Sequence, residues 1–238
     1  MLDRTVRRVT GPALDAAGRR LARAGVRPGA LTASGFVAGA AACAAAASSH
    51  WSLALALWLV NRVLDGLDGP VARARGSTSC GGFLDVVADF AVYGGFVAGV
   101  AVARPEARLA CVVLLATYYV SGTALLAQSC LAERRGGGGD GRSLAFSGGI
   151  AEGTETVVVY ALFCLLPGAA ETIAWSFAAA VGFTAIQRVV GGARLLRVVA
   201  PPDGAGTAGA LPIEGASRPG HRPGDRSRPL AAPERGAP

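Results

Sequence analysis

Long apolar stretches separated by short polar ones run through most of this sequence of 238 residues. Several of them continue for about 20 residues almost without charge, which is the length that an α-helix needs to cross a bilayer. A backbone inside lipid must satisfy its own hydrogen bonds, so we expect helices. The pattern predicts an all-α polytopic membrane protein with six transmembrane helices, at residues 30–49, 51–68, 83–103, 109–131, 150–167 and 171–199.

The two ends of the chain differ from this membrane domain, which we place at residues 28–200. Residues 1–27 alternate arginines with apolar side chains, which predicts an amphipathic juxtamembrane helix, interrupted near Gly11 and Pro12. A secretory signal peptide fits less well, because the basic region is too long and no cleaved apolar core follows it. Residues 201–238 are rich in Pro, Gly, Ala and Arg, which predicts a disordered tail.

Composition supports the membrane prediction and excludes other classes. Hydrophobic residues make up 52% of the chain, charged residues 16%, and the mean hydropathy is +0.43, which a soluble domain rarely reaches. The sequence has no lysine, and its arginines collect at the ends of alternate apolar segments and in the tail. Because cytoplasmic loops carry the excess of positive charge, we expect a cell-membrane protein with both termini and the second and fourth loops in the cytoplasm. No aromatic residues interleave with the arginines, so nucleic-acid binding is not expected.

The residues that most hydrolases and zinc sites require are sparse. The five cysteines show no CxxC spacing, and the two histidines, His50 and His221, fall in a short loop and in the tail. Neither a zinc site nor a Ser/His or Cys/His pair can be assembled from them. We interpret the cysteines as small core residues.

Four aspartates lie where the second apolar segment ends and the third begins. Asp65 and Asp68 are three positions apart and Asp85 and Asp89 are four apart, so each pair lies on one face of a helix. Each carboxylate at membrane depth costs about 2.5–3.5 kcal/mol on insertion scales, so the group requires compensating cations. Clustered carboxylate oxygens suit Mg2+ or Mn2+, and a pair of such ions suits phosphoryl chemistry. The sequence therefore predicts a divalent metal site, with two ions.

The residues from Asp65 to Asp89 resemble a family signature. They match D-x2-D-G-x2-A-R, a spacer, and G-x3-D-x3-D of the CDP-alcohol phosphatidyltransferase family at all eight fixed positions. Upstream, residues 28–32 resemble the P-N-x-L-T element of that family, with Gly29 in place of asparagine. The resemblance implies six transmembrane helices around a cavity open to the cytoplasm, often in a homodimer. It also implies transfer of a phosphatidyl group from a CDP-linked lipid, which we expect to be CDP-diacylglycerol, to a small hydroxyl acceptor, with release of CMP.

The resemblance also assigns roles to these residues. Asp65, Asp68 and Asp85 would be metal ligands, and Asp89 would complete the metal cluster and act as the general base. The CDP pocket would be shaped by Gly69, Ala72, Arg73 and Gly81.

The acceptor alcohol is left open by the motif. Serine, glycerol 3-phosphate and inositol phosphate are all candidates, and a phosphorylated acceptor would need cations such as Arg134, Arg135, Arg142 and Arg188. Each of these arginines also fits a role as a topology anchor, although Arg188 and Arg62 lie within apolar segments, which suggests carboxylate partners or a cavity. The alternative function is a non-catalytic transport or assembly protein that uses the acids as an ion site. An internal repeat, which many transporters have, is not evident.

Overall fold

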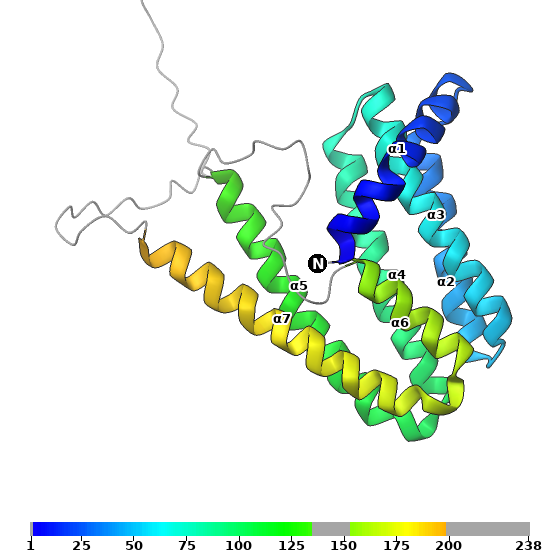
Figure 1. The fold of residues 1–238 in the computed structure, drawn as a ribbon, viewed down its shortest axis with the longest axis vertical. Coiled ribbons are helices and arrows are strands. Elements are labelled where there is room, and N and C mark those ends of the chain that lie inside the picture. Colours follow the sequence, from blue (N-terminus) through cyan, green and yellow to red (C-terminus); the bar gives the residue numbers. More distant parts are fainter. Residues whose placement is uncertain (1, 135–152, 199–238) are drawn as a thin grey trace, which may run out of the picture. The chain divides into compact units, whose positions relative to one another are not determined.

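The computed structural model describes residues 2–134 and 153–198, and all regular elements in these ranges are helices. Figure 1 shows their arrangement. The all-α prediction is confirmed for this part of the chain. The elements are α1 (Leu2–Arg23), α2 (Pro28–Ala47), α3 (Trp51–Arg75), α4 (Ser79–Ala103), η1 (Pro105–Ala107), α5 (Arg108–Arg134), α6 (Gly153–Leu165), η2 (Pro167–Ala169) and α7 (Ala170–Val198).

Helices α2 to α7 coincide with the six predicted segments, but they differ in how well each suits a bilayer. Four are long and apolar enough to cross one: α2, α4, α5 with the preceding η1, and α7 with the preceding η2. The apolar sequence of α3 is interrupted by the charged residues Arg62, Asp65 and Asp68, although the helix itself is continuous, and α6 has only 13 described residues. A protein with several membrane-spanning helices is thus supported, whereas crossing by α3 and α6 stays a prediction.

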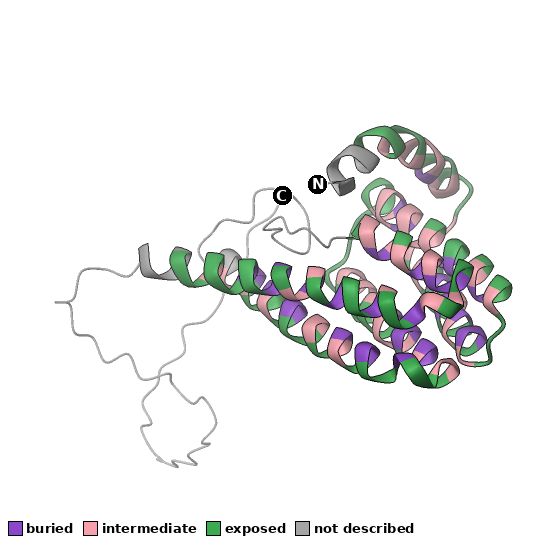
Figure 2. Ribbon diagram, turned by 60° about the horizontal axis from the view of Figure 1, so that its bottom comes forward, coloured by how far each residue is buried: buried purple, intermediate pink, exposed green. Residues whose placement is uncertain are grey.

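Small residues allow α2 to pack closely against both α3 and α4. A β-carbon at Gly99 of α4 would lie 2.7 Å from the carbonyl oxygen of Cys43, so only glycine fits there. The core also contains an aromatic cluster, in which Trp58, Phe96 and Tyr160 are fully buried against one another. Helices α5 and α7 run side by side (Figures 1 and 2). Buried residues lie on the facing sides of the helices, and many large apolar side chains are exposed, as expected for a lipid-facing surface (Figure 2).

The N-terminal helix α1 is continuous where the sequence predicted an interruption. It continues through Pro12 from Leu2 to Arg23, so the predicted interruption near Gly11 and Pro12 is wrong. The proline side is exposed, and a proline inside a helix costs about 3 kcal/mol, which the packing of the following turns can offset. Gly18 provides that packing: a β-carbon there would lie 3.1 Å from the carbonyl carbon of Pro70 in α3. Helix α1 is therefore docked on α3 beside the aspartate motif.

The predicted tail, residues 201–238, lies outside the described residues, as do residues 135–152 of the fourth loop.

Candidate active site

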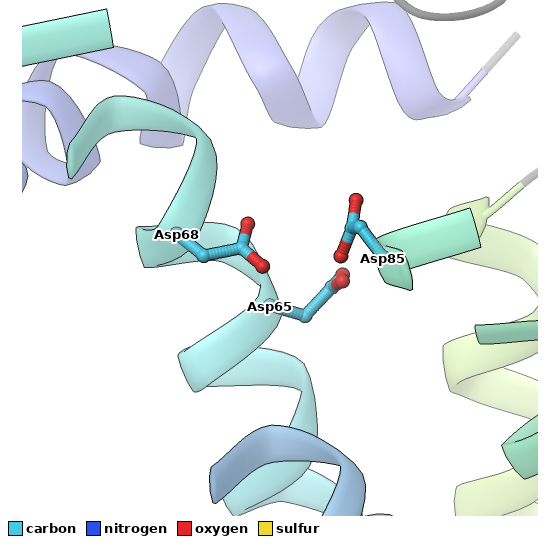
Figure 3. A group of neighbouring side chains, drawn as sticks. All are labelled: Asp65, Asp68 and Asp85. Carbon is cyan, nitrogen blue, oxygen red and sulfur yellow. The ribbon is translucent and has the colours of Figure 1, made fainter. Parts of the chain in front are cut away.

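Helices α3 and α4 bring three of the four motif aspartates together. Asp65 and Asp68 follow one another on a face of α3, and Asp85 lies in the second turn of α4. One carboxylate oxygen from each lies within 4.8 Å of the others, and Figure 3 shows the three side chains pointing toward a common point. Asp68 is buried, with 8% of its surface exposed. The convergence expected from the spacing of the motif is thus found for Asp65, Asp68 and Asp85.

The donor set of this cluster fits a hard divalent cation. Carboxylate oxygens are the ligands that Mg2+ and Mn2+ prefer, and three negative charges so close together require positive compensation. The pocket between them has a volume of about 10 Å³, and all four motif aspartates line it. This volume corresponds to roughly one water-sized sphere, which is space for an ion.

Helix α2 supplies a hydrogen-bond donor to the cluster. Thr32 Oγ1 donates to Asp68 Oδ2 at 3.0 Å, from the turn that follows Pro28 at the start of α2. The hydroxyl thereby fixes the orientation of the most buried carboxylate, as outer partners of metal ligands commonly do. The sequence signal for this contact was the element at residues 28–32, whose last position is this threonine.

The fourth motif aspartate, Asp89, forms an ion pair with an arginine. Arg62 Nη2 donates to Asp89 Oδ1 at 2.9 Å, and Arg62 Nη1 lies 3.5 Å from Asp65 Oδ2. The expectation that Arg62 has carboxylate partners is therefore confirmed. Asp89 still lines the pocket, one helical turn beyond Asp85. The structure thus places the fourth aspartate next to the cluster but in an ion pair.

Three further residues near the cluster lie outside the motif, so the sequence did not predict their contacts with the site. Asn61 is buried and donates from Nδ2 to the carbonyl oxygen of Gly35 at 2.8 Å, which ties α3 to α2. Tyr93 of α4 accepts from Arg62 Nη1 at 2.7 Å, and Trp58 lies under the same guanidinium. All three lie on helix faces that the sequence could only predict to be buried.

The residues predicted to shape the CDP pocket lie along the adjacent surface. Gly69 and Ala72 are half-buried on α3, and Gly81 donates its backbone N–H to Thr78 Oγ1 at 3.1 Å, which caps the start of α4. Arg73 is exposed and donates to Asp15 Oδ1 of α1 at 2.8 Å. Arg73 therefore binds a carboxylate of the juxtamembrane helix in this structure.

The candidate acceptor residues are only partly described. Arg135 and Arg142 lie outside the described residues, and of Arg134 only its place at the end of α5 is described. Arg188 is buried on α7, where Nη1 donates to Ser121 Oγ of α5 at 2.8 Å. Gln128 donates to the carbonyl oxygen of Arg188, so this part of α7 is joined to α5 by polar contacts.

The helical fold and the carboxylate cluster are those expected for one family of membrane enzymes. Residues 26–187 match the family model of CDP-alcohol phosphatidyltransferase, and the chain belongs to this family. It is a membrane-bound transferase that moves a phosphoalcohol group from a CDP-alcohol in phospholipid biosynthesis. This membership excludes the alternative of a non-catalytic transport or assembly protein.

The chain is also similar to known proteins in sequence and in fold. The chain is 37% identical over 196 residues to the inner membrane protein YnjF of Escherichia coli (strain K12), across 81% of this chain and 95% of that protein. The fold is similar to phosphatidylinositol phosphate synthase (PgsA1) of Mycobacterium tuberculosis with CDP-DAG bound. That match has a TM-score of 0.60 and 23% identity, and it covers 75% of this chain and 92% of the other. The same enzyme in its apo form gives a TM-score of 0.57 at 25% identity, over 73% and 93%.

Proposed function

We propose that this protein transfers the phosphatidyl group of CDP-diacylglycerol to a small hydroxyl acceptor and releases CMP. The observation that carries the proposal is the convergence of Asp65, Asp68 and Asp85 within 4.8 Å, in a pocket that Asp89 also lines. Further support comes from the mycobacterial synthase that shares the fold, which has been solved with CDP-DAG bound and in complex with manganese and citrate.

Asp65, Asp68 and Asp85 would hold Mg2+ or Mn2+ in this proposal. When bound, the metal would neutralise charge on the pyrophosphate and polarise the phosphorus that is attacked. Two ions are expected for phosphoryl transfer, and a second ion would draw on Asp89 as a further ligand.

Asp89 would act as the general base. Its carboxylate would take the proton from the acceptor hydroxyl, whose oxygen then attacks the lipid-side phosphorus in line. A phosphorus–oxygen bond to the acceptor forms, the bond to the CMP oxygen breaks, and CMP leaves with the bridging electron pair. The proton that Asp89 receives is afterwards released to water, so the reaction consumes no other reactant.

Gly69, Ala72, Arg73 and Gly81 would shape the site for CDP. The two glycines leave space beside the backbone, and the guanidinium of Arg73 would bind phosphate oxygens. Arg73 is 67% exposed and Asp15 45%, so their ion pair is of the exposed kind that contributes at most about 1 kcal/mol. A doubly charged pyrophosphate could therefore replace Asp15 as the partner of Arg73.

We further propose that α2 to α7 all cross the membrane, with both termini and the active site on the cytoplasmic side, and that the protein forms a homodimer. In this arrangement the aspartates at the end of α3 and the start of α4 lie toward the cytoplasm. The candidate acceptors are serine, glycerol 3-phosphate and inositol phosphate. A phosphorylated acceptor would be bound by one or more of four arginines: Arg134, Arg135, Arg142 and Arg188.

The test is CMP release by the purified protein. The protein in detergent would be mixed with CDP-diacylglycerol, Mn2+ and each acceptor in turn, and CMP and the lipid product would be separated by chromatography. We expect CMP to form with one acceptor and not with the others. A control Glu106→Gln variant, altered in η1 between α4 and α5, should behave as the wild type. If no acceptor gives CMP above the rate without acceptor, the proposed reaction is wrong.

A further inference from the structure

A basic hollow lies where helices α1 and α3 both end. Gly18 of α1 packs closely on Pro70 of α3, and one turn further along each helix lie small residues, Ala22 and Ala74. Their small side chains leave space between the two helices. The hollow has a volume of about 470 Å³, which is within the usual range of ligand sites. It is lined by Arg19, Ala22, Arg23, Ala74 and Arg75.

The positive charge of this hollow is not compensated by carboxylates. Three of its lining residues are arginines and none is acidic. Within residues 2–134 and 153–198, none of these three arginines forms an ion pair with a carboxylate. The acidic side chain one turn before Arg19 on α1, Asp15, is bound to Arg73 instead. Three like charges around one hollow repel one another, so the arrangement favours an anion between them.

The ends of the two helices account for only part of this charge. Arg23 Nε donates to the carbonyl oxygen of Arg19 at 3.4 Å, and Arg75 Nη1 donates to that of Val26 at 3.2 Å. Basic side chains are common in the last turn of a helix, because each helix end carries about half a negative charge. Two helix ends thus offset about one of the three positive charges. Since each guanidinium has five N–H donors, most of these donors are left for a ligand.

The hollow lies beside the first helix that suits a bilayer. Residues 24–27 connect the end of α1 to Pro28, where α2 begins, and α2 is long and apolar enough to cross a membrane. Basic residues directly next to a membrane-spanning helix lie at the depth of the lipid head groups, where anionic phosphates are concentrated. This position favours a lipid phosphate over a soluble one.

We propose that Arg19, Arg23 and Arg75 bind the head-group phosphate of an anionic phospholipid such as phosphatidylglycerol. The planar N–H groups of a guanidinium can bind two phosphate oxygens at once. One phosphate would thereby join the end of α1 to the end of α3, in addition to the contact of Gly18 with Pro70. The site is separate from the aspartate cluster, since no residue lines both pockets. The inference does not depend on the proposed reaction.

Lipid binding to the purified full-length protein tests this site. Native mass spectrometry of the protein in detergent would measure its affinity for dioleoylphosphatidylglycerol and for dioleoylphosphatidylcholine. We expect the wild type to bind the anionic lipid more tightly. One hydrogen bond to a charged group corresponds to a factor of about ten or more, so combining Arg19→Gln, Arg23→Gln and Arg75→Gln should lower this affinity by roughly 100-fold. Equal affinity of the wild type for the two lipids would overturn the proposal.

A matched control separates the hollow from the overall charge. Arg8→Gln, Arg20→Gln and Arg27→Gln combined remove the same charge from exposed positions that do not line the hollow. In detergent no charged membrane surface is present, so this control should bind phosphatidylglycerol as the wild type does. A loss as large as that of the first triple variant would mean that total charge attracts the lipid, and it would reject the site.

A second variant keeps all three arginines, in case the triple variant cannot be purified. Ala74→Glu places a carboxylate in the hollow. We expect it to lose the preference for phosphatidylglycerol and to raise the melting temperature in lipid-free detergent, because the carboxylate compensates the positive charge. Ala24→Glu, at an exposed position outside the hollow, should do neither. If Ala74→Glu binds phosphatidylglycerol as tightly as the wild type, the proposal is wrong.

Competition distinguishes the lipid from soluble phosphates. Inorganic phosphate or glycerol 3-phosphate, added at the same concentration as the lipid, should not displace phosphatidylglycerol. Displacement by either would show that the hollow binds a soluble phosphate, and it would overturn the lipid assignment. No readout here uses CMP release, so a failure of lipid binding leaves the proposed function standing, and an inactive protein leaves this site testable.

Discussion

Replacing Thr32 with valine would keep the branched shape of the side chain and remove the hydroxyl that donates to Asp68 Oδ2 at 3.0 Å. Asp68 is 8% exposed, so little water can replace the lost donor. A hydrogen bond to a charged group contributes about 1.5–3 kcal/mol. Since about 1.4 kcal/mol corresponds to a factor of ten, Mn2+ affinity should fall roughly 10- to 100-fold. The same range, about 10–100-fold, is usual when an outer partner of a metal ligand is removed.

The assay is the Mn2+ concentration that gives half-maximal CMP release at saturating CDP-diacylglycerol and acceptor. Thr32→Ser keeps the hydroxyl and should stay close to the wild type. Thr117→Val removes a hydroxyl that donates within α5, to the carbonyl oxygen of Leu114 at 2.8 Å, and should have no effect on Mn2+. The reasoning is refuted if Thr32→Val needs no more Mn2+ than the wild type, or if Thr32→Ser shifts the midpoint as far as valine does.

Three other changes test separate parts of the account. Excess chelator should abolish CMP release and added Mg2+ or Mn2+ should restore it, because the clustered carboxylates need a cation; full activity in chelator would contradict the metal role. Gly18→Ala should lower the melting temperature, because overpacking against Pro70 costs about 1–3 kcal/mol, while Gly11→Ala, with nothing within 4 Å of the new carbon, should not. In a chain without its natural cysteines, Ser77→Cys should react with an impermeant maleimide only after permeabilisation; labelling in intact cells would reverse the proposed topology.

Sequence reasoning located the helices well because hydropathy and helix length are local properties. The predicted segment 51–68 nevertheless ends seven residues before α3 does, at Arg75. Hydropathy falls after Asp68, and Pro70 suggests an end, yet the proline packs against Gly18 of α1 and the helix continues. Helix α1 likewise stays helical across Pro12, and its packing on α3 offsets the cost of this proline. In both places, contacts between helices distant in the sequence outweigh a local signal, and such contacts cannot be read from spacing.

The candidate site shows a similar limit. Spacings of three and four placed Asp65 with Asp68 and Asp85 with Asp89 on single faces. The structure confirms that α3 and α4 bring three of these aspartates, Asp65, Asp68 and Asp85, together. Spacing does not give the rotation of one helix about the other, and this rotation decides that Asp89 contacts Arg62. The hydroxyl of Thr32 reaches the cluster because α2 packs on α3, over 36 residues of sequence separation. The motif thus predicted the carboxylates, while their partners depended on tertiary packing.

The central claim is that Asp89 removes the acceptor proton while the other three aspartates hold the metal. The most direct measurement compares Asp89→Asn with Asp65→Asn by CDP-diacylglycerol binding with Mn2+ present, and by CMP release in a single turnover at saturating acceptor. Asn keeps the size of the side chain and removes the basic oxygen. We expect Asp89→Asn to bind the CDP-lipid as the wild type does and to release CMP more slowly by about 100-fold or more, the usual scale of general base catalysis. Asp65→Asn should weaken both. A normal rate of CMP release by Asp89→Asn would contradict the assignment.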